Sequence, residues 1–245
     1  MEIKSRLQLF LSSTFEDTKF EQDFMLQYVF PFLREEICRP LGLDFDIVTM
    51  RWGVNGISGD THKTSELCMK QLENSKTCSI GTAYVTFQGH RYGWCPFPSK
   101  IERTEFEQIL SAAQSSENFD DAKLAHLREP YWKLDVSSEP QLYVLQPISH
   151  MPGCGAYIIS EDDQIQAAQD AVFKADREKK RKDASYRYWG WGKIFESIQE
   201  VLREGSKALS EEQREKYVIS VTHDEVNRGI LRNVVLKTKK VILSP

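Results

Sequence analysis

The sequence predicts an α/β fold in which a parallel sheet of about five strands is flanked by helices. Two observations predict this fold. Apolar or β-branched runs of strand length recur at 7–11, 45–50 and 78–87. Each run is followed by a polar loop and then by a segment with helical periodicity. Cycles of strand, loop and helix form right-handed crossovers, which place their strands in parallel.

The first cycle leads from the strand at 7–11 to one amphipathic helix expected at 16–38. Pro31 is expected to kink this helix, because proline cannot donate a backbone hydrogen bond. Ser13 or Thr14 can cap its first turn by accepting from a free N–H group. The apolar residues at helical spacing are Phe15, Phe20, Phe24, Tyr28 and Leu33.

The next two cycles follow the same order. The second has a strand at 45–50, a loop at 51–60 and a helix at 65–75. The third has a strand at 78–87, a loop at 88–100 that contains glycine and proline, and a helix at 104–114.

The rest of the chain is expected to complete the sheet. Further strands are expected at 141–147, 217–221 and 234–243, and a helix is expected to begin after Thr222. Between the first two of these, residues 160–212 form charged, helical segments that we interpret as an insertion or appendage. We therefore expect one domain over 1–245 that contains this insertion.

Composition excludes several kinds of partner. The 32 Lys and Arg residues against 36 Asp and Glu give a net charge of -4, and no basic stripe suits a nucleic-acid backbone. No apolar run approaches the roughly 20 residues of a membrane span, and the start does not resemble a signal peptide. The five cysteines form no C-x-x-C pair, so we expect reduced thiols, no metal site and a cytoplasmic location.

Three polar loops are expected at one edge of the sheet, because ligands of parallel sheets bind at the carboxyl ends of the strands. Ser12, Ser13, Thr14 and Phe15 follow the first strand, where hydroxyls and helix N–H groups can hold a phosphate or a ribose hydroxyl. A simple helix cap is the alternative. One cap needs fewer hydroxyls, and this excess favours a loop that faces a ligand.

The other two loops offer cationic and aromatic groups. Arg51 can bind phosphate and Trp52 can stack on a base or nicotinamide ring. Alternatively, Trp52 closes the sheet edge and Arg51 pairs with a nearby acid. The third loop has the same kinds of group, with Arg91 as a possible phosphate ligand and Tyr92 and Trp94 as rings that can stack.

Five motifs in order, LFLSSTFEDTKFEQD, IVTMRWGV, SELCMKQLENS, GHRYGW and TEFEQIL, carry a family resemblance. Together they resemble the TIR-like N-terminal module, a domain of unknown function, of NACHT and WD-repeat proteins and related STAND ATPases. The resemblance covers about residues 5–150 and implies a flavodoxin-like fold. No G-x-x-x-x-G-K-[ST] loop is present, so we expect no ATPase within this chain.

The resemblance also implies a possible chemistry. Active TIR domains and the related deoxyribosyltransferases cleave N-glycosidic bonds with a glutamate near the start of a helix, because a carboxylate stabilises the cationic sugar that forms. Glu107, in TEFEQIL, looks like that glutamate, and Glu105 is its neighbour. The alternative is that both are acids favoured by the helix dipole.

Two functions remain at this stage. The first is an interaction module that self-associates, or joins a TIR-like or adaptor protein, in innate-immune or stress signalling. The second is an N-glycosidase that cleaves NAD or a related nucleotide with Glu107 at the ribose. Neither requires a cofactor, and NAD would be a substrate or ligand.

Overall fold

The structure is a computed structural model that describes residues 6–14, 16–50, 59–154, 172, 175 and 190–231. The chain divides into two compact units. The first comprises Met1–Gly53, Ser65–Cys95 and Ile219–Pro245, and the second comprises Val54–Thr64 and Pro96–Val218. Each unit therefore joins segments that are far apart in the sequence.

The first unit is built on a parallel sheet of β1 (Arg6–Ser13), β2 (Asp44–Thr49) and β3 (Tyr84–Phe87). β1 is the central strand, in the order β2-β1-β3. Its residue Phe10 lies opposite Val48 of β2 and Tyr84 of β3. The structure thus confirms three parallel strands in the three predicted strand regions.

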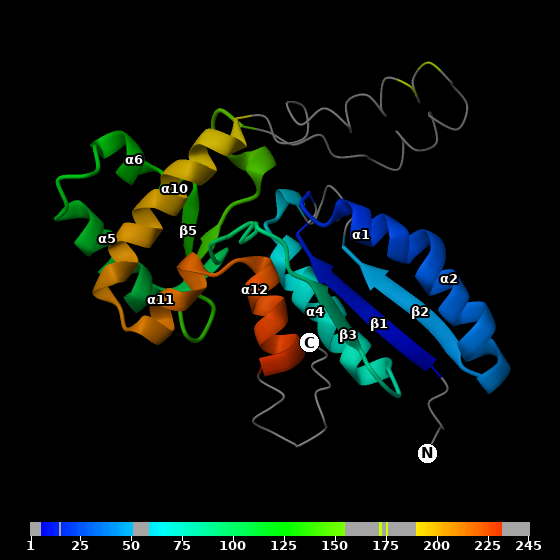
Figure 1. The fold of residues 1–245 in the computed structure, drawn as a ribbon. Helices are drawn as coiled ribbons and strands as arrows, with labels where there is room; N and C mark the ends of the chain where they lie inside the picture. The colour runs from blue at the N-terminus through cyan, green and yellow to red at the C-terminus, as the bar shows by residue number, and fades with distance from the viewer. Residues whose placement is uncertain are drawn as a thin grey trace. The chain divides into compact units, whose positions relative to one another are not determined.

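Helices lie on both sides of this sheet (Figure 1). They are α1 (Lys19–Phe24), η1 (Met25–Val29), α2 (Phe30–Phe32), η2 (Leu33–Cys38), η3 (Arg39–Leu41), α4 (Thr64–Cys78), α12 (Val221–Val226) and η6 (Asn227–Leu231). The elements α1 to η2 follow one another without a break, and we call residues 19–38 the helix run. On one face of β1, Leu9 and Leu11 pack against Phe30 and Cys38 of the helix run.

The helix run differs from its prediction in two respects. It begins at Lys19, Thr18 precedes it, and no side chain caps α1, so the predicted cap by Ser13 or Thr14 is wrong. It also contains two π-helical segments, η1 and η2, on either side of α2, which holds Pro31. A proline nitrogen cannot donate to the helical ladder, and wider turns can accommodate such a break.

The second unit contains an antiparallel sheet of β4 (Lys100–Glu102), β5 (Trp132–Asp135) and β6 (Leu142–Leu145). Its order is β4-β6-β5. Its helices are α5 (Arg103–Gln114), α6 (Asp121–Ala125), η4 (Ile148–His150), α10 (Trp191–Gly205), η5 (Ser206–Ala208) and α11 (Glu211–Val218).

Aromatic packing holds the second unit together. Phe106 of α5 stacks on Tyr143 of β6, with ring centroids 4.2 Å apart, and contacts Trp132 of β5. Helix α10 approaches α5 so closely that a Cβ atom on Gly205 would lie 2.5 Å from the carbonyl oxygen of Ile109. A glycine is required there, because any other residue would force the two helices apart.

Several predicted elements need correction. The strand predicted at 141–147 is β6, which pairs antiparallel and not in a parallel sheet. The strand predicted at 217–221 is wrong, because α11 ends at Val218 and α12 begins at Val221. The described residues place three strands in the parallel sheet, and the flavodoxin-like arrangement of about five strands is not confirmed. The strand predicted at 234–243 lies outside the described residues.

The domain prediction of 1–245 with an insertion at 160–212 stays a prediction. Most of 160–189 lies outside the described residues. The described part, α10 with η5, packs onto the second unit through Ile198, Val201 and Leu202. Among the described residues, no helix is long and apolar enough to cross a membrane.

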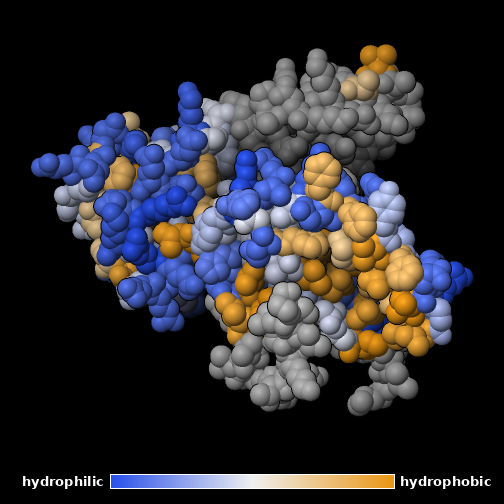
Figure 2. Space-filling model, viewed as in Figure 1, coloured by the Kyte–Doolittle hydropathy of each residue, from blue (hydrophilic) through white to orange (hydrophobic). Residues whose placement is uncertain are grey.

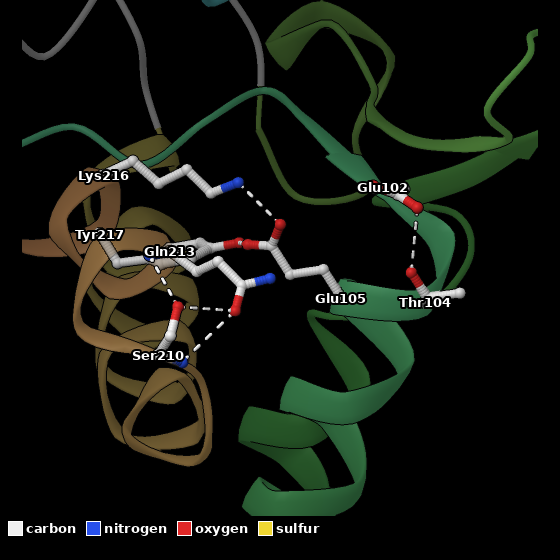
Figure 3. A network of polar contacts seen from close by, with 7 residues as sticks. All are labelled: Glu102, Thr104, Glu105, Ser210, Gln213, Lys216 and Tyr217. Atoms are coloured by element: carbon white, nitrogen blue, oxygen red, sulfur yellow. Dashed lines mark hydrogen bonds and ion pairs between the residues drawn. The ribbon is translucent and has the colours of Figure 1, made fainter.

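A buried carboxylate connects α5 to α11 in the second unit (Figure 3). Glu105 is 7% exposed and accepts hydrogen bonds from the hydroxyl of Tyr217 and, at 2.7 Å, from Nζ of Lys216. Tyr217 is fully buried, and burial together with Glu105 raises its pKa. The carboxylate of Glu105 therefore satisfies a phenol that has no access to water.

We expect Glu105→Ala to lower the free energy of unfolding by about 2–4 kcal/mol, because it leaves the Tyr217 hydroxyl buried without an acceptor. Glu107→Ala is the matched control. Glu107 is half exposed and pairs with Arg103 at 2.8 Å, so its loss should cost under about 0.5 kcal/mol. Urea unfolding of both variants measures the difference, and equal losses would contradict this role of Glu105.

Candidate functional site

Three segments of the first unit meet at the carboxyl end of its parallel sheet. Thr14 directly follows β1, and residues 88–95 form the loop after β3. The start of α12 joins them, because the backbone N–H of Val221 donates to the carbonyl oxygen of Trp94 at 2.9 Å. The carboxyl edge of a parallel sheet is the usual place for a ligand, and we take this edge as the candidate site.

A buried carboxylate, Glu225 of α12, lies at this edge. It is 5% exposed, and the hydroxyl of Ser12 donates to its Oε2 at 2.5 Å. Burial raises the pKa of Glu225 from its ordinary value of 4.5 to about 7, although the hydrogen bond from Ser12 opposes this shift. The carboxyl group of Glu225 therefore changes its protonation state close to neutral pH.

Two further side chains share the surroundings of Glu225. Burial, with a smaller effect of the Glu225 charge, raises the pKa of the Cys68 thiol to about 12. This thiol stays protonated and does not act as a nucleophile at neutral pH. The pKa of Tyr84 is also raised by burial, next to the hydroxyls of Ser12 and Thr86. The region around Glu225 thus combines several protonated groups in a buried environment.

A second carboxylate, Asp17, holds the loop after β3 to the turn after β1. Its Oδ1 accepts from the hydroxyl of Thr14, and its Oδ2 accepts from the backbone N–H of Arg91 at 2.8 Å. These hydrogen bonds, the one from Thr14 first, lower the pKa of Asp17. A Cβ atom on Gly89 would lie 2.2 Å from Asp17 Oδ2. The loop can approach Asp17 because this position is glycine.

The side chains of the helix run also fix the turn after β1. The carbonyl oxygen of Thr14 accepts from the hydroxyl of Thr18 at 2.6 Å and from Nε2 of Gln22 at 3.1 Å. Gln22 is fully buried. The amide nitrogen of Gln22 thus bonds into this turn, whereas its buried Oε1 has no hydrogen-bond partner among the described residues.

The hydroxyls of Ser12 and Thr14 bond to carboxylates of the first unit and do not cap α1. Both residues are buried, and their hydroxyls donate to Glu225 and Asp17 within the first unit. Ser13 is also buried, and it lies opposite Phe87 in the sheet. That these residues bind a ligand stays a prediction.

Other predicted residues at the same edge face outward. Tyr92 and Trp94 are about half exposed. The guanidinium of Arg91 pairs with Glu16 at 2.5 Å, and the hydroxyl of Tyr92 lies 2.8 Å from Nδ1 of His223. The structure thus brings the hydroxyls at the end of β1 and the aromatic loop after β3 to one edge, as the sequence predicts.

The remaining predicted site residues either lie outside the described residues or belong to the second unit. Phe15, Arg51 and Trp52 lie outside the described residues. Glu105 and Glu107 belong to the second unit, where Glu105 is buried against Tyr217 and Glu107 pairs with Arg103. A catalytic role of either glutamate stays a prediction. Among the described residues, no three His, Cys, Asp or Glu side chains gather as a metal site would require.

The sequence does not single out Glu225 as a site residue. It predicts a strand at 217–221 and a helix that begins after Thr222, whereas α12 begins at Val221. A local signal was present: Ser220 caps α12 by accepting from the backbone N–H of His223 at 3.1 Å. Nothing local shows that Glu225 reaches Ser12, which lies 213 positions earlier.

The raised pKa of Glu225 predicts how stability depends on pH. Glu225 binds its proton more tightly in the folded state than in the unfolded state, so its contribution is fully present below about pH 4.5 and is lost as pH rises through about 7. The loss amounts to about 3 kcal/mol in the free energy of unfolding. Urea unfolding between pH 4.5 and pH 8 measures it.

Glu225→Gln is the control for this prediction, because its amide does not titrate and can still accept from Ser12. The difference between wild type and Glu225→Gln isolates Glu225 from the other titrating groups. A difference that stays constant between pH 4.5 and pH 8 would show that Glu225 has an ordinary pKa.

The sequence of this chain is similar to segments of several large proteins. No family model matches it, and no solved structure does. NACHT and WD repeat domain-containing protein 2 of Homo sapiens is 30% identical over 237 residues, which are 96% of this chain and 12% of that protein. NACHT domain- and WD repeat-containing protein 1 of Homo sapiens is 27% identical over 207 residues, or 83% of this chain and 12% of that protein.

A more distant likeness is shorter. Telomerase protein component 1 of Rattus norvegicus is 29% identical over 161 residues, or 55% of this chain and 6% of that protein. This chain thus spans 12% of the length of the NACHT and WD-repeat proteins that it matches over most of its own length. Through these two relatives, the chain is related to the NACHT and WD-repeat proteins.

Proposed function

We propose that this chain is a TIR-like N-terminal assembly module of a NACHT-type signalling protein, located in the cytoplasm. It acts by self-association, or by joining a TIR-like or adaptor protein, in innate-immune or stress signalling. The observation that carries this proposal is the similarity of 96% of this chain to 12% of a NACHT and WD-repeat protein. A segment of that size corresponds to one module beside others.

The chemistry of the chain supports an assembly role. The sequence has no G-x-x-x-x-G-K-[ST] loop, so a nucleotide switch would have to be supplied from elsewhere in the parent protein. At the candidate site, the hydroxyls of Ser12 and Thr14 bind side chains of the same unit. By contrast, several large apolar side chains of the helix run face solvent. Exposed apolar surface of that kind marks interaction sites.

This proposal predicts self-association of the isolated chain. Sedimentation velocity should show an average mass that rises with concentration between about 1 µM and 1 mM, the range of weak association. Fusion to a trimeric coiled coil should strengthen the association, because tethering raises the effective concentration. A chain that stays monomeric over this range, and whose fusion stays a single trimer, would contradict the proposal.

A second candidate function is N-glycosidase activity toward NAD or a related nucleotide. Two observations favour it: Glu225 is a carboxyl group that titrates near neutral pH at the carboxyl edge of the parallel sheet, and Arg91, Tyr92 and Trp94 face outward at that edge. In such a reaction the bond between the ribose and nicotinamide breaks, and water takes the place of nicotinamide. A carboxylate stabilises the cationic sugar as this bond breaks.

The two candidate carboxylates can be separated by an assay of nicotinamide release from NAD by the trimeric fusion. A glycosidase should lose turnover by about 100-fold or more when its carboxylate is removed. Loss of nicotinamide release in Glu107→Ala would identify Glu107 as the catalytic carboxylate, as the family resemblance implies. Loss in Glu225→Gln would identify Glu225, at the sheet edge, instead. Val136→Lys, at an exposed residue away from these carboxylates, is the folded control, and no turnover in any assembled form would contradict this second function.

A further inference from the structure

An exposed row of aromatic side chains runs along the helix run of the first unit. Its members are 87%, 58%, 62% and 56% exposed, in chain order. They are Phe20, Phe24, Tyr28 and Phe32, and we call them the aromatic ridge. Residues four positions apart share one face of a helix, and the rings of Phe24 and Tyr28 touch, with centroids 5.2 Å apart.

The ridge is not the face by which the helix run packs onto its sheet. That packing uses Phe30 and Cys38, which are buried, with Met25, Leu26 and Leu33 beside them. The helix run is therefore apolar on two faces, and the sheet covers one of them. A helix that is apolar on both faces normally has a partner on each.

The exposed apolar area has the size of an interface. An aromatic residue buries 150–250 Å² when it is fully covered, so the four partly exposed ridge residues offer on the order of 500 Å². The largest apolar patch on a typical monomer is about 300–600 Å² and is often functional. A standard interface uses about 800 Å² per partner, so the ridge would supply most of one side. Figure 2 shows hydrophobic surface, in orange, on the side of the first unit where α1 and α2 lie in Figure 1.

A hollow of about 520 Å³ lies between the helix run and β2. Its lining residues are Leu26, Phe30, Pro31, Arg34, Ile47, Val48 and Thr49. Leu26 and Phe30 belong to the side of the helix run that packs onto the sheet, so this hollow is not part of the aromatic ridge.

We propose that a second copy of this chain docks on the aromatic ridge, with the two helix runs packed antiparallel about a twofold axis. This inference rests on the proposed function, self-association, and names the surface that performs it. The same patch faces itself across a twofold axis, as in most homodimers. In the antiparallel arrangement Phe24 of one copy lies opposite Tyr28 of the other.

The test is sedimentation velocity of the full chain and of the double variant Phe24→Lys/Tyr28→Lys. Four like charges at the centre of the interface should raise the dissociation constant at least 10-fold. Because both side chains are exposed in the single chain, its melting temperature should stay unchanged. Val136→Lys, at an equally exposed apolar residue of the second unit, is the matched control and should associate like the wild type.

A mixing experiment tests whether the ridge of one copy faces the ridge of the other. Phe24→Lys/Tyr28→Lys and Phe24→Glu/Tyr28→Glu chains should each be monomeric alone, because like charges meet across the axis. Mixed in equal amounts they should form a dimer, since each lysine then faces a glutamate. If the wild type forms a dimer but the mixture of the two variants stays monomeric, the twofold arrangement is overturned.

The outcomes separate this surface from the function on which it rests. If the wild type associates and the double variant associates equally well, the ridge is not the interface, and self-association remains with another surface. If the wild type does not associate even as a trimeric fusion, the assembly function itself fails. Loss of association in both the double variant and Val136→Lys would show a general effect of added charge and would also overturn the ridge proposal.

Discussion

The first unit depends on a buried hydrogen bond between Ser12 and Glu225, which are 213 positions apart. Ser12 is the last residue but one of the central strand β1, so Glu225 connects α12 to the middle of the sheet. Burying a carboxyl group is costly unless it is protonated or hydrogen-bonded. Both conditions are met here, because its pKa is near 7 and Ser12 donates to it. The contact between α12 and the sheet is therefore linked to proton binding by Glu225.

The second unit uses a carboxylate in a similar way. Glu105 satisfies the buried hydroxyl of Tyr217 and the Nζ of Lys216, so α5 and α11 share one polar contact inside an aromatic core. Two glutamates, one in each unit, are thus committed to internal contacts. This commitment favours structural roles for Glu105, and it leaves Glu225 as a group whose position suits either a structural or a chemical role.

The surface of the first unit favours a role in binding a partner. Its polar groups at the sheet edge are largely satisfied internally, whereas its helix run exposes an aromatic row of four residues. Exposed rings of this size cost free energy in water unless a partner covers them. A module that meets its partners through an apolar helix face, and not through a polar pocket, fits a chain related to large multi-domain proteins.

The sequence by itself determined the three parallel strands of the first unit, the helices that follow the first two of them, and α5 of the second unit, because hydrophobic periodicity and turn residues are local signals. It also placed the hydroxyls at the end of β1 and the loop at 88–95 at one sheet edge. Only the tertiary structure decided that β6 pairs antiparallel, that Glu105 and not Glu107 is buried, and that Glu225 meets Ser12. It also decided which apolar face of the helix run meets the sheet. The physical reason is that pairing, burial and pKa depend on groups brought together from distant positions, and local periodicity carries no record of those partners.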